Sequence, residues 1–376
     1  MNWSLRTRRS VVVACLATMV LSGSISEATS GFSLVAATRL GGASGSEMFA
    51  VSSSSISGAW AVGRTDNGIG GGAIWRIRPT SAAWVSVALP SPHLPAINDV
   101  STFGTSAWII GSGYQTSRFV YEWNGTSWLN HTVATWPASF HAGAILINGT
   151  KSVWVAGIEG KQPACAHWNG SSWSFCALKH IFGVGESGFS SLTAIPGTMN
   201  VIVAGYRNSQ GRSSGVPFAE MWNGSKWNEM PSAAVSGGLD ASVAVSASSS
   251  TNAWMVSPMF TGTKVEPVIM HWNGVRWKQS PAASAIFTSS GLIAVDTRSA
   301  SDAWAVGDIS TGLGENAPLI EHWDGTSWQI VPSQPKSAQS LLTGVSLVPG
   351  STCRVLAVGV ATFSLDPNVP FGERNC

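Results

Sequence analysis

The stretch that decides the fold is the pair of segments Ala303–Gly307, which reads Ala-Trp-Ala-Val-Gly, and Trp323–Trp328, which reads Trp-Asp-Gly-Thr-Ser-Trp. In the first segment Trp and Val alternate with alanines, so an extended strand would have one bulky face and one small face. The Asp-Gly pair in the second segment is typical of a tight turn between two strands. The two segments therefore predict part of a small antiparallel sheet.

Both segments recur along the chain. The first occurs seven times, at Ala59–Gly63, Ala107–Gly111, Val153–Gly157, Val201–Gly205, Ala253–Ser257, Ala303–Gly307 and Val355–Gly359. The second occurs as the tryptophan pairs Trp123/Trp128, Trp168/Trp173, Trp222/Trp227, Trp272/Trp277 and Trp323/Trp328, with a looser first copy at Trp75/Trp84. The second residues of the first segment are 46 to 52 positions apart, a period that indicates a β-propeller or a β-array.

Each repeat unit is predicted to contain four antiparallel strands. In the sixth unit we expect them at Ser290–Val295, Ala303–Gly307, Leu319–Trp323 and Trp328–Val331. The bulky face of the second strand in one unit can pack on the small face of the second strand in the next unit. No sustained 3.6-residue pattern supports a helical alternative. The sequence thus predicts an all-β, seven-bladed β-propeller of four-stranded antiparallel blades.

The two ends of the repeat array complement one another. The segment Phe371–Cys376 aligns with a third strand, after which the seventh unit has no fourth strand. The segment Phe32–Val35 resembles a fourth strand that belongs to no unit. We expect this N-terminal strand to pair with the last blade and close the ring, which would remove two exposed sheet edges.

The N-terminus has the pattern of a secretory signal. Arg6, Arg8 and Arg9 precede an uncharged stretch over residues 10–26, and Ser26 and Ala28 are the small residues of a cleavage site. We therefore expect a signal peptide over residues 1–28 and a single propeller domain over residues 29–376. The product would be secreted, extracellular or associated with the cell surface, without a transmembrane anchor. Residues 7–11 partly match a twin-arginine signal, so the export route stays open.

Four cysteines would remain after cleavage, and an even number in an exported protein favours disulfides. The hairpin register that places Trp168 opposite Trp173 also places Cys165 opposite Cys176. Cys353 opens the second strand of the last unit and Cys376 ends its third strand, so antiparallel pairing brings these two together as well. We predict the disulfides Cys165–Cys176 and Cys353–Cys376.

Composition excludes some classes of function. Charged residues make up 11% of the chain, against about 25% in typical soluble domains, and the net charge of +2 comes without a basic run. This excludes a nucleic-acid-binding protein. His167, His271 and His322 occupy the same place in three units, where they would point apart, so we expect them to pack at the seams between blades and not to bind metal. We expect a monomer without metal or cofactor.

A binding site is expected where the repeats differ most, in the loops between second and third strands. The polar candidates there are Arg64, Asp66, Arg118, Arg207, Arg212, Lys264, Glu266, Asp308 and Glu315. Most tryptophans are predicted to be core, but a partly exposed one at a blade seam could stack on a sugar ring. The Asn-Gly-Thr/Ser sequons at Asn124, Asn169 and Asn223 are interpreted first as hairpin turns.

The two repeated segments resemble those of uncharacterised exported bacterial propeller-repeat proteins. They are less closely similar to kelch and galactose-oxidase-like propellers and to tectonin-type propeller lectins. The resemblance implies a propeller that binds a ligand. The copper oxidases on this scaffold use a Tyr-Cys pair with further Tyr and His ligands, for which this chain offers only Tyr114, Tyr121 and Tyr206. The leading hypothesis is an exported, non-enzymatic protein that recognises a glycan or a protein partner through its loop face or its Trp-lined blade seams. The alternative is an extracellular hydrolase or lyase with its site at the axial mouth of the propeller.

Overall fold

The computed structural model describes most of the chain from Phe32 to Asn375. The gaps in this description are residues 38–39, 41–44, 56–57, 66–70, 79–82, 113–117, 134–135, 177–186, 209–214, 233–237, 240–242, 311–314, 335–338, 352–354 and 364–365. The expected signal peptide, Cys353 and Cys376 therefore lie outside the described residues.

The described residues form strands, with one short 3₁₀ helix, η1 (Ala283–Ile286). The first strands of the units are β2 (Ser46–Ser55), β6 (Ile97–Phe103), β10 (Phe140–Ile147), β14 (Ser187–Ala194), β19 (Ala244–Ser249), β23 (Ser290–Ser299) and β27 (Gln339–Leu347). The second strands are β3 (Gly58–Thr65), β7 (Ser106–Ser112), β11 (Val153–Glu159), β15 (Val201–Asn208), β20 (Asn252–Phe260), β24 (Asp302–Ser310) and β28 (Val355–Phe363).

The third strands are β4 (Gly71–Ile77), β8 (Arg118–Trp123), β12 (Gln162–Trp168), β16 (Gly215–Trp222), β21 (Val265–Trp272), β25 (Asn316–Trp323) and β29 (Asp366–Asn375). The fourth strands are β5 (Ala83–Ser86), β9 (Trp128–Asn130), β13 (Trp173–Phe175), β17 (Trp227–Glu229), β22 (Trp277–Ser280) and β26 (Trp328–Ile330). The short strand β18 (Gly238–Leu239) lies between β16 and β20. Successive strands within a unit pair antiparallel, as predicted.

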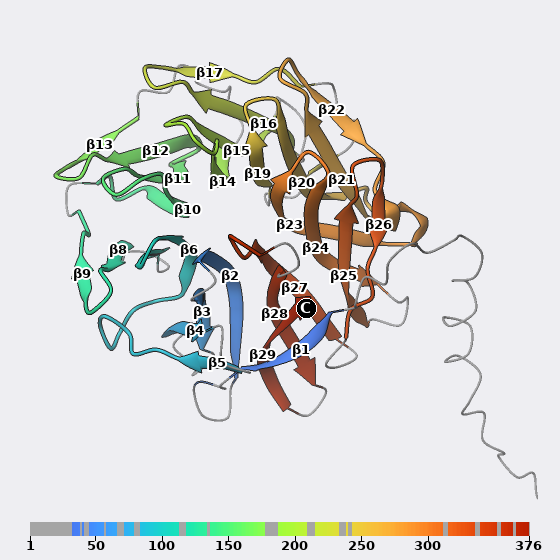
Figure 1. Ribbon diagram of the computed structural model, residues 1–376, viewed down its shortest axis with the longest axis horizontal. Coiled ribbons are helices and arrows are strands. Elements are labelled where there is room, and N and C mark those ends of the chain that lie inside the picture. The colour runs from blue at the N-terminus through green and yellow to red at the C-terminus, as the bar shows by residue number, and fades with distance from the viewer. Residues whose placement is uncertain are drawn as a thin grey trace, which may run out of the picture. The chain divides into compact units, whose positions relative to one another are not determined.

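The first strands lie innermost (Figure 1). Each contacts the first strand of the following unit, from β2 to β6 and onward to β27, and β27 in turn contacts β2. The sheets are therefore arranged around a common axis, which is the architecture of a β-propeller.

The loops between second and third strands are shorter than the sequence predicted. We expected one over Tyr206–Pro217, but β15 extends to Asn208 and β16 begins at Gly215; the corresponding loops of the third, fifth and sixth units shorten in the same way. These stretches were predicted as loops because they differ most between repeats, yet Pro217 pairs with Tyr206 inside the sheet. Proline is compatible with this part of β16 because the fourth strand β17 does not extend that far. A backbone N–H at this position would have no carbonyl oxygen of β17 to bond, so proline removes no sheet hydrogen bond.

The predicted closing strand pairs with the last unit. In β1 (Ser33–Ala37), Leu34 lies opposite Glu373 of β29, just as Ile330 of β26 lies opposite Glu321. By this register Phe32 takes the position that Trp328 has in the sixth unit. The prediction is confirmed. The sequence did not indicate that β1 would also pair in parallel with β5, which makes the last and first units one continuous sheet.

The seams between units are packed large against small. Trp254 and Val256 of β20 share a buried cluster with Ala303 and Ala305 of β24, and the seam between the sixth and seventh units repeats the arrangement with Trp304 at its centre. All five second-strand tryptophans (Trp60, Trp108, Trp154, Trp254 and Trp304) are at most 5% exposed. The repeated indoles are therefore core residues, as predicted for most of them.

The last glycine of the Ala-Trp-Ala-Val-Gly segment is required by a bulge in the first strand. The register of β23 shifts between Leu292 and Ala294, and a Cβ added to Gly307 would lie 2.0 Å from the carbonyl oxygen of Gly291. A side chain there would force the backbone apart. The fifth unit has Ser257 at this position, and its first strand β19 begins only at Ala244.

One polar side chain per inner strand joins most inner strands to the next. We call these side chains the inner belt. Each accepts a backbone N–H of the following strand: Ser52 from Thr102 (3.1 Å), Ser101 from Ile147 (2.9 Å), Thr193 from Ala247 (3.3 Å), Ser246 from Thr297 (3.0 Å), Asp296 from Leu347 (2.8 Å) and Ser346 from Ser53 (3.1 Å). An inner strand is a sheet edge whose N–H groups need partners, and the belt supplies them. In β10 the equivalent residue is Leu146, which cannot accept a hydrogen bond.

The Asn-Gly pairs between third and fourth strands serve the turns, as interpreted from the sequence. The Asn169 side-chain oxygen accepts the N–H groups of Ser171 (3.0 Å) and Ser172 (2.9 Å), and Gly170 has a φ of 97°. Asn124, Asn223 and Asp324 form the same kind of turn. The positive φ favours glycine, so the repeated dipeptide has a sufficient local cause.

Candidate functional site

Most of the loop-face candidates lie at strand ends and not in long loops. Arg64, Arg118, Arg207, Glu266 and Asp308 belong to strands, whereas Lys264 and Glu315 lie next to β21 and β25. Asp66 and Arg212 lie outside the described residues. This placement follows from the longer strands described above.

Several of these candidates make contacts within their own units. Arg64 Nε lies 3.1 Å from a carboxylate oxygen of Glu47, and Lys264 Nζ lies 2.5 Å from Glu266. Such contacts fix the side chain within its own unit and occupy charged groups that could otherwise bind a ligand.

The remaining described candidates have similar local environments. Arg118 donates a hydrogen bond to the carbonyl oxygen of Trp136 (3.0 Å), and Arg207 lies 3.5 Å from a carboxylate oxygen of Glu229. Burial raises the pKa of Asp308. These contacts do not join candidates from different units into one site, so a site on the loop face stays a prediction.

A cavity of about 530 Å³ lies on the axis, between the inner strands. Its wall includes Asp99 of β6 and Asp296 of β23, two carboxylates that the sequence analysis did not single out. Their strands belong to the second and sixth units.

Both axial carboxylates are bonded to backbone. Asp99 accepts the N–H groups of Val100 and Ile145, each at 2.8 Å, and burial raises its pKa to about 7. Asp296 accepts N–H groups of Thr297 and Leu347 at 2.8 Å and the Ser246 hydroxyl at 2.9 Å, and burial raises its pKa too. Their oxygens are therefore used to fasten inner strands, which leaves little for acid–base chemistry.

The histidines that precede the third-strand tryptophans stack on indoles of their own units. The ring centroids are separated by 4.0 Å for His167–Trp154, 4.4 Å for His271–Trp254 and 4.1 Å for His322–Trp304. Their predicted packing role is confirmed. Among the described residues, no group of three His, Cys, Asp or Glu side chains could hold a metal ion.

In the second unit, Glu122 occupies the histidine position and contacts both Ser106 and His131. The Ser106 hydroxyl lies 3.2 Å from one carboxylate oxygen, and His131 Nε2 lies 2.9 Å from the other. A hydrolytic triad needs the imidazole between the hydroxyl and the carboxylate. Here the carboxylate is in the middle, so His131 cannot remove the hydroxyl proton.

A second cavity, which we call the seam cavity, lies between the third and fourth units and has a volume of about 330 Å³. Its lining comes from the third unit (Trp154, His167, Ser174, Phe175 and Cys176) and from the fourth unit (Trp222, Ser225, Lys226 and Trp227). Another cavity, of about 310 Å³, lies between the second and third units. The sequence predicted Trp-lined seams in general but gave no sign of which seams would be hollow.

The seam cavity combines aromatic rings with hydroxyl groups. Trp222 is half-buried, so its ring can be reached from solvent. The Phe175 ring belongs to the other face of β13, where it packs on Trp136 and Phe140. Trp154 and Trp227 are buried behind Trp222, with ring centroids 5.6 and 5.7 Å from its own. Ser174 is exposed beside Phe175. The cavity therefore has apolar ring faces next to hydrogen-bonding groups.

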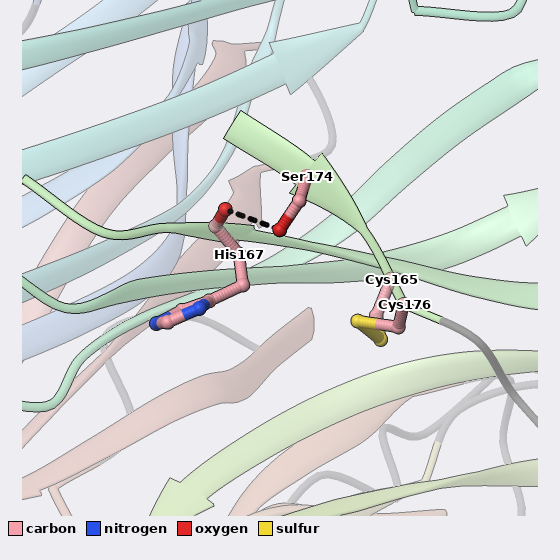
Figure 2. Close-up of a disulfide and its surroundings, with 4 residues drawn as sticks. All are labelled: Cys165, His167, Ser174 and Cys176. Atoms are coloured by element: carbon pink, nitrogen blue, oxygen red, sulfur yellow. Dashed lines mark hydrogen bonds between the residues drawn. A yellow bond between two sulfur atoms is a disulfide. The ribbon is translucent and has the colours of Figure 1, made fainter. Parts of the chain in front are cut away.

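A disulfide fixes one wall of the seam cavity (Figure 2). Cys165 of β12 bonds Cys176, which follows β13, with the Cα atoms 5.2 Å apart. Beside it, the Ser174 hydroxyl donates to the His167 carbonyl oxygen at 3.5 Å. This disulfide confirms one of the two predicted pairs. The other, Cys353–Cys376, falls outside the described residues.

The comparisons with known proteins support the fold. No protein-family model matches the chain, and no curated protein matches it. A solved structure of YCF48 bound to D1 peptide is 16% identical, with a TM-score of 0.59 over 92% of this chain and 95% of that one. The WD40 β-propeller domain of Doa1 is 10% identical, with a TM-score of 0.58 over 92% and 97%. A mutant Aleuria aurantia lectin with α-methyl-L-fucoside is 13% identical, with a TM-score of 0.49 over 77% and 97%. The chain has the β-propeller fold. No helix among its described residues has the length and apolarity needed to cross a membrane.

Proposed function

We propose that this chain is an exported, seven-bladed propeller that binds a glycan, without catalysing a reaction, in the seam cavity between its third and fourth units. The observation that carries the proposal is the lining of that cavity, in which the half-buried ring of Trp222 occurs together with the hydroxyl-bearing Ser174 and Ser225. A sugar ring has C–H groups on its faces and hydroxyls on its rim, so it needs both kinds of neighbour. A volume of about 330 Å³ is at the lower end for small-molecule sites and suits one or two sugar rings.

One further feature supports a built binding site. The Cys165–Cys176 disulfide holds the Ser174 side of the cavity in place, which lowers the entropic cost of binding.

The enzymatic alternative, a hydrolase or lyase at the axial mouth, has weaker support. The described axial carboxylates are bonded to backbone N–H groups, and the Ser106–Glu122–His131 contacts are in the wrong order for nucleophilic catalysis. A protein partner is the other alternative from the sequence. The YCF48 structure contains a bound peptide, but the contacts of this chain do not single out a peptide site.

The test is a glycan-array screen of the secreted protein, followed by titration with tryptophan fluorescence as the readout. Trp222→Ala is expected to weaken binding at least about fivefold by removing one ring face. Trp323→Ala is the matched control, because Trp323 has the same register in the sixth unit and is also half-buried. Binding that is equally sensitive to both substitutions, or no binding to any glycan, would contradict the proposal. N-terminal sequencing of the secreted protein tests cleavage after Ala28.

A further inference from the structure

The charge of the seam cavity narrows the kind of sugar it would take. Lys226 is the one Lys or Arg in the described lining. No Asp or Glu belongs to that lining. The nearest acid in the sequence, Glu229, lies 3.5 Å from Arg207, which neutralises its charge. The cavity is therefore positively charged.

Lys226 has no other evident task in the fold. Among the described residues its ammonium group forms no ion pair, in contrast to Lys264, which is held by Glu266. The hairpin turn uses only its backbone, whose N–H donates to the Asn223 side-chain oxygen at 3.0 Å. The equivalent turn residue is Ser127, Ser172 or Ser327 in three other units. The turn therefore does not require a lysine.

His167 does not supply a second charge at neutral pH. Its Nε2 atom lies 3.0 Å from the Ser152 hydroxyl, and its ring stacks on Trp154. Burial lowers the pKa of His167, so the ring is neutral near pH 7. Lys226 is then the single cation available to a ligand in the described lining.

We propose that the seam cavity binds an acidic sugar, whose ring lies against Trp222 and whose carboxylate pairs with the Lys226 ammonium group. This inference rests on the proposed glycan-binding function and adds the charge of the ligand. Uronic acids are the simplest members of this class, since they carry a carboxylate in place of the primary hydroxyl of a hexose.

The test compares pairs of sugars that differ only in having a carboxylate or a primary hydroxyl group. Methyl glycosides of glucuronic, galacturonic and mannuronic acid are titrated against the secreted full-length protein beside the methyl glycosides of glucose, galactose and mannose. At low salt at least one uronide is expected to bind about threefold or more tightly than its neutral counterpart, and salt should narrow the difference. Lys226→Ala should bring the affinity for the uronide down to that for its neutral counterpart, and Lys226→Arg should keep the preference.

Arg276→Ala is the matched control, because Arg276 has the same exposed turn position in the fifth unit. The preference should survive this substitution. Equal affinity for the acidic and neutral sugars, with binding still weakened in Trp222→Ala, would overturn the acidic-sugar inference and leave the glycan function standing. No binding of any sugar, here or on the array, would overturn both.

Discussion

The closing strand provides the sharpest test of the architecture. Phe32 is 2% exposed, packs edge-on against Trp304 with ring centroids 5.6 Å apart, and takes the position of a fourth-strand tryptophan. Its N–H donates to the carbonyl oxygen of Pro332 at 3.3 Å. The substitution Phe32→Ala removes a buried ring from a closely packed seam.

The expected loss is about 3 to 5 kcal/mol of unfolding free energy, the usual range for truncating a buried phenylalanine. Leu34→Ala in the same strand is the control, since Leu34 is 46% exposed and its truncation should cost about 0.5 kcal/mol or less. Denaturant unfolding gives the free energies, and hydrogen exchange shows whether the β1 and β29 amides open first in Phe32→Ala. If both variants unfold at the wild-type midpoint, β1 does not hold the last unit and the closure argument is wrong.

Three further predictions concern other parts of the fold. Gly307→Ala should cost about 3 kcal/mol in denaturant unfolding, because its Cβ would lie 2.0 Å from the Gly291 carbonyl oxygen; a change under about 1 kcal/mol would show that the bulge can shift. Replacing Cys165 and Cys176 together by alanine should cost about 2 kcal/mol and weaken seam-cavity binding, whereas unchanged binding would show that the disulfide does not shape the cavity. Burial raises the pKa of Glu373 to about 7, and one of its carboxylate oxygens has no partner among the described groups. The fold favours the protonated form of Glu373, so its contribution to the free energy of unfolding is complete below about pH 4.5 and is lost as the pH rises through 7. The loss amounts to about 3 kcal/mol, and Glu373→Gln should make the free energy of unfolding less dependent on pH in this range. If the pH dependence is the same in the variant, Glu373 is not the group responsible.

The sequence predicted those parts of the fold that depend on register within a repeat. Trp168 and Trp173 on either side of an Asn-Gly turn determine the hairpin, and the same register then places Cys165 beside Cys176. The closing strand followed for a similar reason, since a fourth strand was missing at one end of the array and present at the other. Side chains alternate regularly along a strand, so one known pair of opposed residues determines which other residues of the two strands lie opposite each other.

The features that the sequence did not predict depend on contacts between units. Asp99 is one of several polar residues in β6, and its role appears only when Ile145 of the next unit is placed beside it. The stretch before Pro217 was predicted as a loop because it varies between repeats, whereas the strands extend into it. The seam cavity depends on how the side chains of two neighbouring units pack against each other. The sequence pattern within a single repeat does not specify this packing.

The seam cavity lies at the seam where the inner belt is interrupted. An intact belt bond does not by itself close a seam, because the second and third units are joined by the Ser101–Ile147 bond and still have a cavity of about 310 Å³ between them. Between β10 and β14 the belt position is Leu146 and the bulge position is Gly143, and neither has a side chain that can accept a hydrogen bond. The third and fourth units are thus joined without the inner-belt bond found at the other seams, and their seam is the one that contains both the cavity and the Cys165–Cys176 disulfide. A covalent link within the third unit stiffens the sheet on one side of this seam. A binding site benefits from this combination, because walls that are less tightly joined leave room for a ligand while each wall stays rigid.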